Sequence, residues 1–235
     1  MTTQTFPSRN RALGALLIVD ALLSFAPIAI LAPAIGWPAS LGKPAAEQMA
    51  AIAAAPGAVM AGYGLYLLYS LLVAPVMIGL AARLRGGLSS PLGMTVVAFA
   101  TLSVLARAIG ILRWLTVMPA LAAAHAVADP ATRAQIERLF SAITAYGGGI
   151  GEVLGVSLFM AASVGTLSTA TLLRGGMPRL LSAAGVVVAL MLTALAAPAV
   201  RLPGFMPVAA AVTALSLWMI AVGLWVAMRP GTSTA

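Results

Sequence analysis

The sequence predicts an all-α fold: a polytopic membrane protein built as a six-transmembrane-helix bundle. Of its 235 residues, 62% are hydrophobic and 8% are charged, and the mean hydropathy is +1.06. A soluble domain is about half apolar and about 25% charged. The apolar residues form runs of about 20, each long enough to cross the hydrocarbon core of a bilayer. Short loops separate these runs, so we expect residues 1–235 to form a single integral membrane domain.

Proline, glycine and arginine residues mark the ends of the predicted spans. Arg9 and Arg11 precede the first apolar run, Pro119 follows the third, and Pro198 ends the fifth. Pro27 and Pro33 predict a kink or an end within the first span, because proline removes a backbone donor. The six spans are predicted at about 12–35, 58–82, 92–118, 148–173, 180–199 and 207–228.

Two shorter helices are predicted outside the spans, at about 44–55 and 130–145. The first lies between Pro44 and Pro56 and is too short to cross a bilayer. The second begins at Asp129-Pro130, an N-cap residue followed by proline at the first helical position. Its apolar residues recur at helical spacing, which predicts an amphipathic helix at the membrane surface. Gly147–Gly149 predict a break or a bend before the fourth span.

Basic residues predict the orientation, because inner loops carry more lysine and arginine. With the N-terminus inside, seven basic residues fall on inner segments and four on outer ones. The inner set is Arg9, Arg11, Arg83, Arg85, Arg174, Arg179 and Arg229; the outer set is Lys43, Arg133, Arg138 and Arg201. Both termini are therefore expected in the cytoplasm.

A glycine stripe, Gly147, Gly151 and Gly155, recurs every fourth residue in the fourth span. This spacing lets two membrane helices approach closely, so the stripe is predicted to be a helix-packing face. Glu152 lies within it, and a carboxylate buried there would need a polar partner.

Four ionisable residues fall within the spans: Asp20, Arg107, Arg113 and Glu152. Helical rise places Arg113 and Glu152 at matching depth, with Arg107 between Glu152 and Asp20. Three interpretations remain open for this set. It is a structural ion-pair network that fixes helix register, a polar anchor in a cavity for a ligand or lipid headgroup, or a proton relay through the two acids.

Other residues give weaker indications. Cysteine is absent and His125 is the one histidine, so neither a cysteine cluster nor a histidine cluster can bind a metal; no metal site and no catalytic residue are predicted. His125 is expected to be exposed. The tyrosines at 63, 66 and 69 and the four tryptophans are interpreted as packing or interfacial belt rather than a ligand cage. Basic residues form no patch, so no nucleic-acid partner is expected. No particular cofactor is indicated.

Two stretches carry a family resemblance, LRGGMPRLLSAAGVVVAL after the fourth span and ALSLWMIAVGLWVAMRP in the last. They resemble the basic-glycine turn with its following span, and the final span, of the domain of unknown function family 4386. ARAIGILRWL lies where such proteins carry a charged third span. The resemblance implies a bacterial six-helix protein of the inner (plasma) membrane, and it supplies no reaction or catalytic residues.

Three functions remain open. The favoured one is a non-enzymatic helical bundle that binds a lipid-like small molecule or a partner membrane protein, including a second copy of itself. The alternative is a small proton-coupled transporter, supported by Asp20 and Glu152, although no inverted repeat is found. A membrane-embedded enzyme is less favoured, because the chain lacks a nucleophile–base set and metal ligands.

Overall fold

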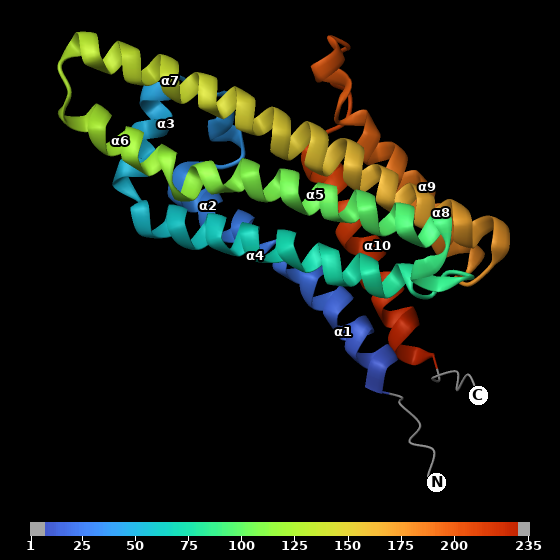
Figure 1. Cartoon of the computed structure of the whole chain (residues 1–235). Helices are drawn as coiled ribbons and strands as arrows, with labels where there is room; N and C mark the ends of the chain where they lie inside the picture. Colours follow the sequence, from blue (N-terminus) through green and yellow to red (C-terminus); the bar gives the residue numbers. More distant parts are fainter. Residues whose placement is uncertain (1–7, 230–235) are drawn as a thin grey trace. The chain divides into compact units, whose positions relative to one another are not determined.

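The computed structural model describes residues 8–229, which form helices joined by short turns, with no strand among them (Figure 1). The predicted polar tail at 230–235 lies outside the described residues. The elements are α1 Ser8–Leu23, α2 Ala26–Ile35, α3 Ala45–Ala54, α4 Pro56–Ala81, α5 Pro91–Leu115, α6 Val117–Val127, α7 Pro130–Gly148, a π-helix Gly149–Met160, α8 Ala161–Arg174, α9 Arg179–Ala194 and α10 Val208–Met228. The all-α prediction is confirmed for this part of the chain.

Five helical stretches of the described chain are long and apolar enough to cross a membrane, as in a multi-pass membrane protein. They are Asn10–Ile35, Pro56–Ala81, Pro91–Val127, Pro130–Arg174 and Val208–Met228. The run predicted as the fifth span contains α9, which has 16 residues. At 1.5 Å per residue α9 is about 24 Å long, short of a hydrocarbon core of about 30 Å. The count of six spans therefore stays a prediction.

Proline interrupts the first predicted span as expected but does not end the third. The first span is interrupted just before Pro27, which takes an early position in α2, and Pro33 lies inside that helix. The third span was expected to end at Met118, but a further helix, α6, follows. Pro119 is the third residue of α6, where the backbone N–H has no partner within the helix, so proline is tolerated there.

The glycines at 147–149 do not break the helix. Helical backbone runs from Pro130 to Arg174, and its middle, Gly149–Met160, is wound as a π-helix. Asp129 caps the start of α7 as predicted, because its carboxylate accepts hydrogen bonds from the backbone N–H groups of Ala131 and Thr132. The helix predicted at 130–145 is thus continuous with the fourth span, and its place at the membrane surface stays a prediction.

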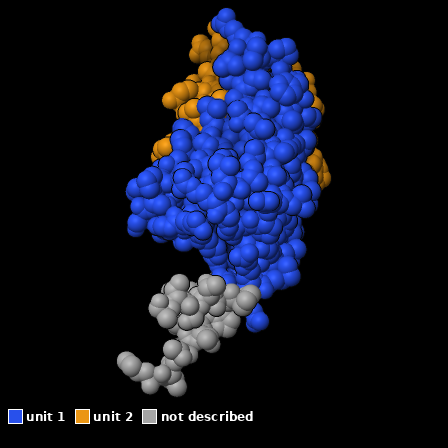
Figure 2. Space-filling view, turned by 90° about the vertical axis from the view of Figure 1, so that its right-hand side faces the viewer, with its two compact units in different colours: residues 1–22, 72–101, 157–235 blue, residues 23–71, 102–156 orange. Residues whose placement is uncertain are grey.

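The described residues belong to two compact units, which Figure 2 draws in different colours. Unit 1 comprises residues 1–22, 72–101 and 157–235. Within it α9 packs against α8 and α10. Small residues bring its helices close: a Cβ at Gly14 of α1 would stand 2.7 Å from the Cβ of Ala227 in α10. The indole of Trp218 donates a hydrogen bond of 2.9 Å to the carbonyl of Leu181.

Unit 2 comprises residues 23–71 and 102–156. Here α6 and α7 form a hairpin, and α3 packs against both of them (Figure 1). Its hydrophobic core consists of the buried side chains Leu31, Ile35, Met49, Ile52, Val59, Tyr63, Ile111, Trp114, Met118, Ala122 and Phe140. Gln48 of α3 fastens the loop before it, donating a hydrogen bond of 2.7 Å to the carbonyl of Lys43. This unit contains Arg107, Arg113 and Glu152.

Candidate functional site

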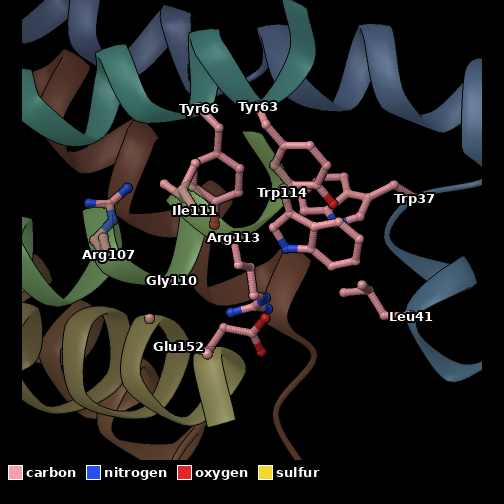
Figure 3. A pocket seen from close by; sticks show the side chains of 12 residues that line it. Trp37, Leu41, Tyr63, Tyr66, Arg107, Gly110, Ile111, Arg113, Trp114 and Glu152 are labelled. Carbon is pink, nitrogen blue, oxygen red and sulfur yellow. The ribbon is translucent and has the colours of Figure 1, made fainter. Parts of the chain in front are cut away.

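A small cavity lies within unit 2, bounded by α4, α5, the junction of α7 with the π-helix, and the loop after α2 (Figure 3). About 40 Å³ is available there to the centres of water molecules, which is room for roughly three waters. The lining residues are Trp37, Leu41, Tyr63, Tyr66, Arg107, Gly110, Ile111, Arg113, Trp114, Gly147, Gly151 and Glu152. The lining thus combines aromatic rings with three ionisable side chains.

The glycine stripe faces α5, and each glycine meets a different residue of that helix. A Cβ at Gly147 would stand 2.6 Å from the Cδ of Arg113, and one at Gly155 would stand 2.7 Å from the Cγ of Arg107. Between them, a Cβ at Gly151 would stand 3.2 Å from the Cα of Gly110. The missing side chains therefore make room for the two arginines and allow backbone contact at the crossing.

Arg113 is buried, with 9% of its surface exposed. Its guanidinium points toward the carboxylate of Glu152 (Figure 3), and the two side chains interact electrostatically. Its Cζ also lies 5.3 Å from the ring centroid of Trp114, within range of a cation–π interaction. Arg113 is thus the arginine that the structure brings to Glu152.

Arg107 is even more buried, at 4% exposure. Its Cζ lies 4.6 Å from the ring centroid of Tyr69, so this guanidinium rests on a side chain of α4. The Nε of Arg107 is buried without a hydrogen-bond partner, and so is the Nε of Arg113. Each nitrogen is a donor whose desolvation is not offset by a protein acceptor.

Glu152 differs from the prediction. It was expected to be a buried acid, but its side chain is exposed although it lines the cavity. Glu152 directly follows Gly151, and successive residues of a helix point in different directions. The glycine therefore faces α5 while the carboxylate lies on another side of the helix, where it lines the cavity.

Asp20 lies in α1 and belongs to unit 1, whereas the other three ionisable residues belong to unit 2. Only 2% of its surface is exposed. A carboxyl group this buried in an apolar helix is held by polar neighbours. Its grouping with Arg107, Arg113 and Glu152 stays a prediction.

Stacked aromatic rings form one wall of the cavity. The rings of Tyr63 and Trp114 are 4.9 Å apart with an angle of 1° between their planes. Trp37 meets Tyr66 edge-on at 5.9 Å. The hydroxyl of Tyr63 is buried without a hydrogen-bond partner. These residues pack as expected, and the packing also places their rings beside the two arginines.

His125 is not exposed, contrary to the prediction. It lies partly buried between α6 and α7, where its Nε2 is 2.9 Å from Oε1 of Glu137. The prediction failed because α6, the helix that presents His125 to α7, was not expected. Within residues 8–229 the structure groups no three histidine, cysteine or acidic side chains that could hold a metal ion.

Two residues of α5 that contact the glycine stripe were not predicted from the sequence. Gly110 forms the backbone contact with Gly151, and Ser103 donates a buried hydrogen bond of 2.7 Å to the carbonyl of Gly155. Their spacing was the available signal. Ser103, Arg107, Gly110 and Arg113 recur at intervals of four and three, which places them along one face of a helix.

Comparison with known proteins adds a family but no activity. No curated protein and no solved structure matches the chain. A family model described as "Domain of unknown function (DUF4386)" matches residues 12–227. This match covers both units and every residue of the site, so the chain belongs to the DUF4386 family.

Proposed function

We propose that this protein binds a lipid-like small molecule, with the polar head of the molecule in the cavity of unit 2. The observation that carries the proposal is the set of buried donors in the cavity lining: Nε of Arg107, Nε of Arg113 and the hydroxyl of Tyr63 have no protein partner. A buried donor left without an acceptor costs about 1–3 kcal/mol. A ligand that supplies acceptors would recover that free energy.

The size of the cavity favours a head group rather than a whole ligand. Pockets for drug-sized molecules measure roughly 300–1,000 Å³, whereas this cavity holds about three waters. Neighbouring positions on the same helices expose large apolar side chains, among them Leu105, Ile109, Leu112 and Leu154. An apolar tail can lie along such a surface while the head group fills the cavity.

The experiment is to identify what co-purifies with the full chain in a mild detergent. Leu41 lines the cavity from the short 3-10 helix Ala39–Gly42, outside the long helices, so Leu41→Trp should fill the cavity with little effect on those helices. Leu88→Trp, at an exposed loop position of unit 1, is the matched control. Mass spectrometry should find a lipid-like molecule with the wild type and the control and much less with Leu41→Trp. Equal retention by all three would contradict the proposal, and a stoichiometric protein in place of a lipid would favour a partner membrane protein or a second copy of the chain.

A proton-coupled carrier is the second candidate, favoured by one observation. Glu152 lies in the π-helix, a rare geometry that occurs often at functional sites. Its carboxylate can exchange a proton, whereas arginine stays charged. Vesicles containing the protein and an entrapped pH dye should then acidify when the co-purified molecule is added, and Glu152→Gln should abolish the signal. No pH change would exclude this candidate.

We further propose that the protein resides in the bacterial inner membrane with both termini in the cytoplasm. The support is the number of apolar helices and the excess of arginine on the segments 83–90 and 174–179.

A further inference from the structure

We propose that one end of unit 1 is an interaction surface for the headgroups of anionic phospholipids. Folding gathers there arginines that are scattered along the sequence, and the side chains of all of them are exposed. This arginine surface consists of Arg11, Arg83, Arg85, Arg174, Arg179 and Arg229. It belongs to unit 1 and is independent of the ligand proposed for the cavity of unit 2.

Hydrogen bonds join the helix ends that carry these arginines. Asn10, near the start of α1, accepts a hydrogen bond from Arg83, which follows the end of α4. The same side chain donates a hydrogen bond of 3.2 Å to the carbonyl of Arg229, which follows the end of α10. The hydroxyls of Thr171 and Ser182, 2.9 Å apart, connect the end of α8 to the start of α9. Figure 1 shows the turns after α4 and α8 at the same end of unit 1 as the start of α1 and the end of α10.

The first argument is charge. Of the five acidic residues in the chain, four belong to unit 2: Glu47, Asp129, Glu137 and Glu152. The acidic residue of unit 1 is Asp20, which is buried in α1. Among the described residues of unit 1, no exposed acidic side chain therefore compensates the arginine surface. A surface of one sign attracts partners of the opposite charge.

The second argument is the kind of basic residue. The surface contains arginine and no lysine, and the lysine of the chain, Lys43, belongs to unit 2. A guanidinium group presents its N–H donors as a planar fork, which matches two oxygens of one phosphate group. This chemistry favours a partner that carries phosphate groups.

The third argument distinguishes a phospholipid from a nucleic acid. Leu173, Leu180 and Met228 are between 76% and 80% exposed, and each is next in sequence to an arginine of the surface. The guanidinium of Arg229 also lies on an aromatic ring, with its Cζ 4.4 Å from the ring centroid of Trp225. Tryptophan and arginine at the end of an apolar helix are typical of the boundary between hydrocarbon and headgroups. A phospholipid supplies a phosphate and hydrocarbon chains together, whereas a nucleic acid supplies only the anion.

The test measures the melting temperature of the purified full chain in neutral detergent. Mixed micelles containing phosphatidylglycerol should raise it, whereas zwitterionic phosphatidylcholine should not. The shift should shrink at high sodium chloride, because the Debye length falls from about 10 Å at 0.1 M to about 3 Å at 1 M. Inorganic phosphate, compared with sodium chloride at equal ionic strength, should give no shift, since it supplies no hydrocarbon.

A triple variant connects the shift to the arginine surface. It combines three substitutions at exposed turn or helix-end positions: Arg85→Gln, Arg174→Gln and Arg179→Gln. A basic residue near an anionic membrane surface contributes roughly fivefold in affinity. The triple variant should therefore bind phosphatidylglycerol on the order of a hundredfold more weakly and lose most of the shift.

The matched control removes the same charge from exposed positions outside the surface. It combines Lys43→Gln, Arg138→Gln and Arg201→Gln, and it should keep the shift. A second control is Leu41→Trp, which fills the cavity of unit 2. No arginine of the surface lines that cavity, so Leu41→Trp should keep the phosphatidylglycerol shift whether or not it retains the co-purified molecule.

Four results would overturn the proposal: equal shifts with the two lipids, a shift that salt does not change, equal loss of the shift in the triple variant and its charge-matched control, or loss of the shift in Leu41→Trp. A full shift with inorganic phosphate would assign the surface to a soluble anion instead. A nucleic acid retained by the wild type and lost by the triple variant, without any lipid shift, would assign it to nucleic acid. The salt series uses the wild type alone, so it decides the question even if the triple variant does not fold.

Discussion

Gly110 of α5 and Gly151 of the π-helix meet backbone to backbone, so that a Cβ at Gly110 would stand 2.8 Å from the Cα of Gly151 and 3.0 Å from the carbonyl oxygen of Gly147. The first contact is shorter than real Cβ atoms show and the second is tighter than most, and both obstructing atoms belong to the backbone. The crossing of the two helices therefore depends on the absence of a side chain at this position.

Gly110→Ala should destabilise the protein by about 1–3 kcal/mol through overpacking, measured as a lower melting temperature in detergent. Gly149→Ala is the matched control, because a Cβ there meets nothing within 4 Å. Alanine favours a helix over glycine by up to about 1 kcal/mol, so the control should be neutral or slightly stabilising. If Gly110→Ala proves as stable as Gly149→Ala, the crossing can adjust to a side chain.

The effects of replacing Arg113 and Glu152 on the free energy of unfolding should be coupled, whereas those of replacing Arg107 and Glu152 should be independent. Glu152→Gln leaves the buried Arg113 charge without its counter-charge, a cost that disappears once Arg113 is also replaced. The cycle of Glu152→Gln with Arg113→Met should give a coupling free energy within the usual range of about 0.5–3 kcal/mol. Thermal or denaturant unfolding in detergent measures it.

A second double-mutant cycle, of Glu152→Gln with Arg107→Met, provides the comparison. Arg107 rests on Tyr69 rather than on Glu152, so its coupling free energy should be near zero. A larger value for Arg107 than for Arg113 would contradict the pairing that the structure shows.

The sequence predicted what depends on hydropathy and local capping. Apolar runs gave the helices of a membrane protein, and Asp129-Pro130 marked the start of α7 because a cap acts through adjacent residues. The break after α1 was also predicted in place, since Pro27 restricts the residues before it.

The features that could not be predicted from the sequence depend on tertiary contacts between helices. Pro119 was interpreted as the end of a helix because nothing local revealed that a new helix, α6, would begin two residues before it. Arg107 and Arg113 are alike in the sequence. Only the packing of α5 places Arg107 on Tyr69 of α4 and Arg113 beside Glu152 of the π-helix. The π-helix has no sequence signature beyond its glycines, because these are equally compatible with a break or a bend.

The cap of α7 should make the stability dependent on pH at the acid end. Hydrogen bonds hold the pKa of Asp129 below its ordinary value of 3.8. The largest effect comes from the hydroxyl of Thr132, and the backbone N–H groups of Thr132 and Ala131 also donate to the carboxylate. Because the pKa is lowered in the folded protein, the contribution of the cap is full above the ordinary pKa and is lost as pH falls through the lowered one.

Asp129→Asn keeps a capping oxygen but cannot titrate, so it is the informative variant. The difference in melting temperature between wild type and Asp129→Asn should be constant at neutral pH and should shrink as pH falls from about 5, just above the ordinary carboxyl pKa, toward about 2. A difference that does not change with pH would show that the charge of Asp129 contributes nothing to the cap.

The α6–α7 hairpin should extend beyond the bilayer on the outer side, as the distribution of basic residues predicts. The helical stretches Pro91–Val127 and Pro130–Arg174 have 37 and 45 residues, or roughly 55 and 68 Å of helix, against a hydrocarbon core of about 30 Å. Charged side chains gather where these stretches adjoin, at Asp129, Arg133, Glu137 and Arg138.

The chain has no native cysteine, so single cysteines can report their exposure to water. Val127, which is 88% exposed at the end of α6, should react as Val127→Cys with an impermeant maleimide in intact cells. Ser89→Cys, in the arginine-rich segment, should react only after the membrane is opened. If Ser89→Cys reacts in intact cells and Val127→Cys does not, the orientation is reversed; if Val127→Cys stays unreactive even after the membrane is opened, the hairpin does not extend into water.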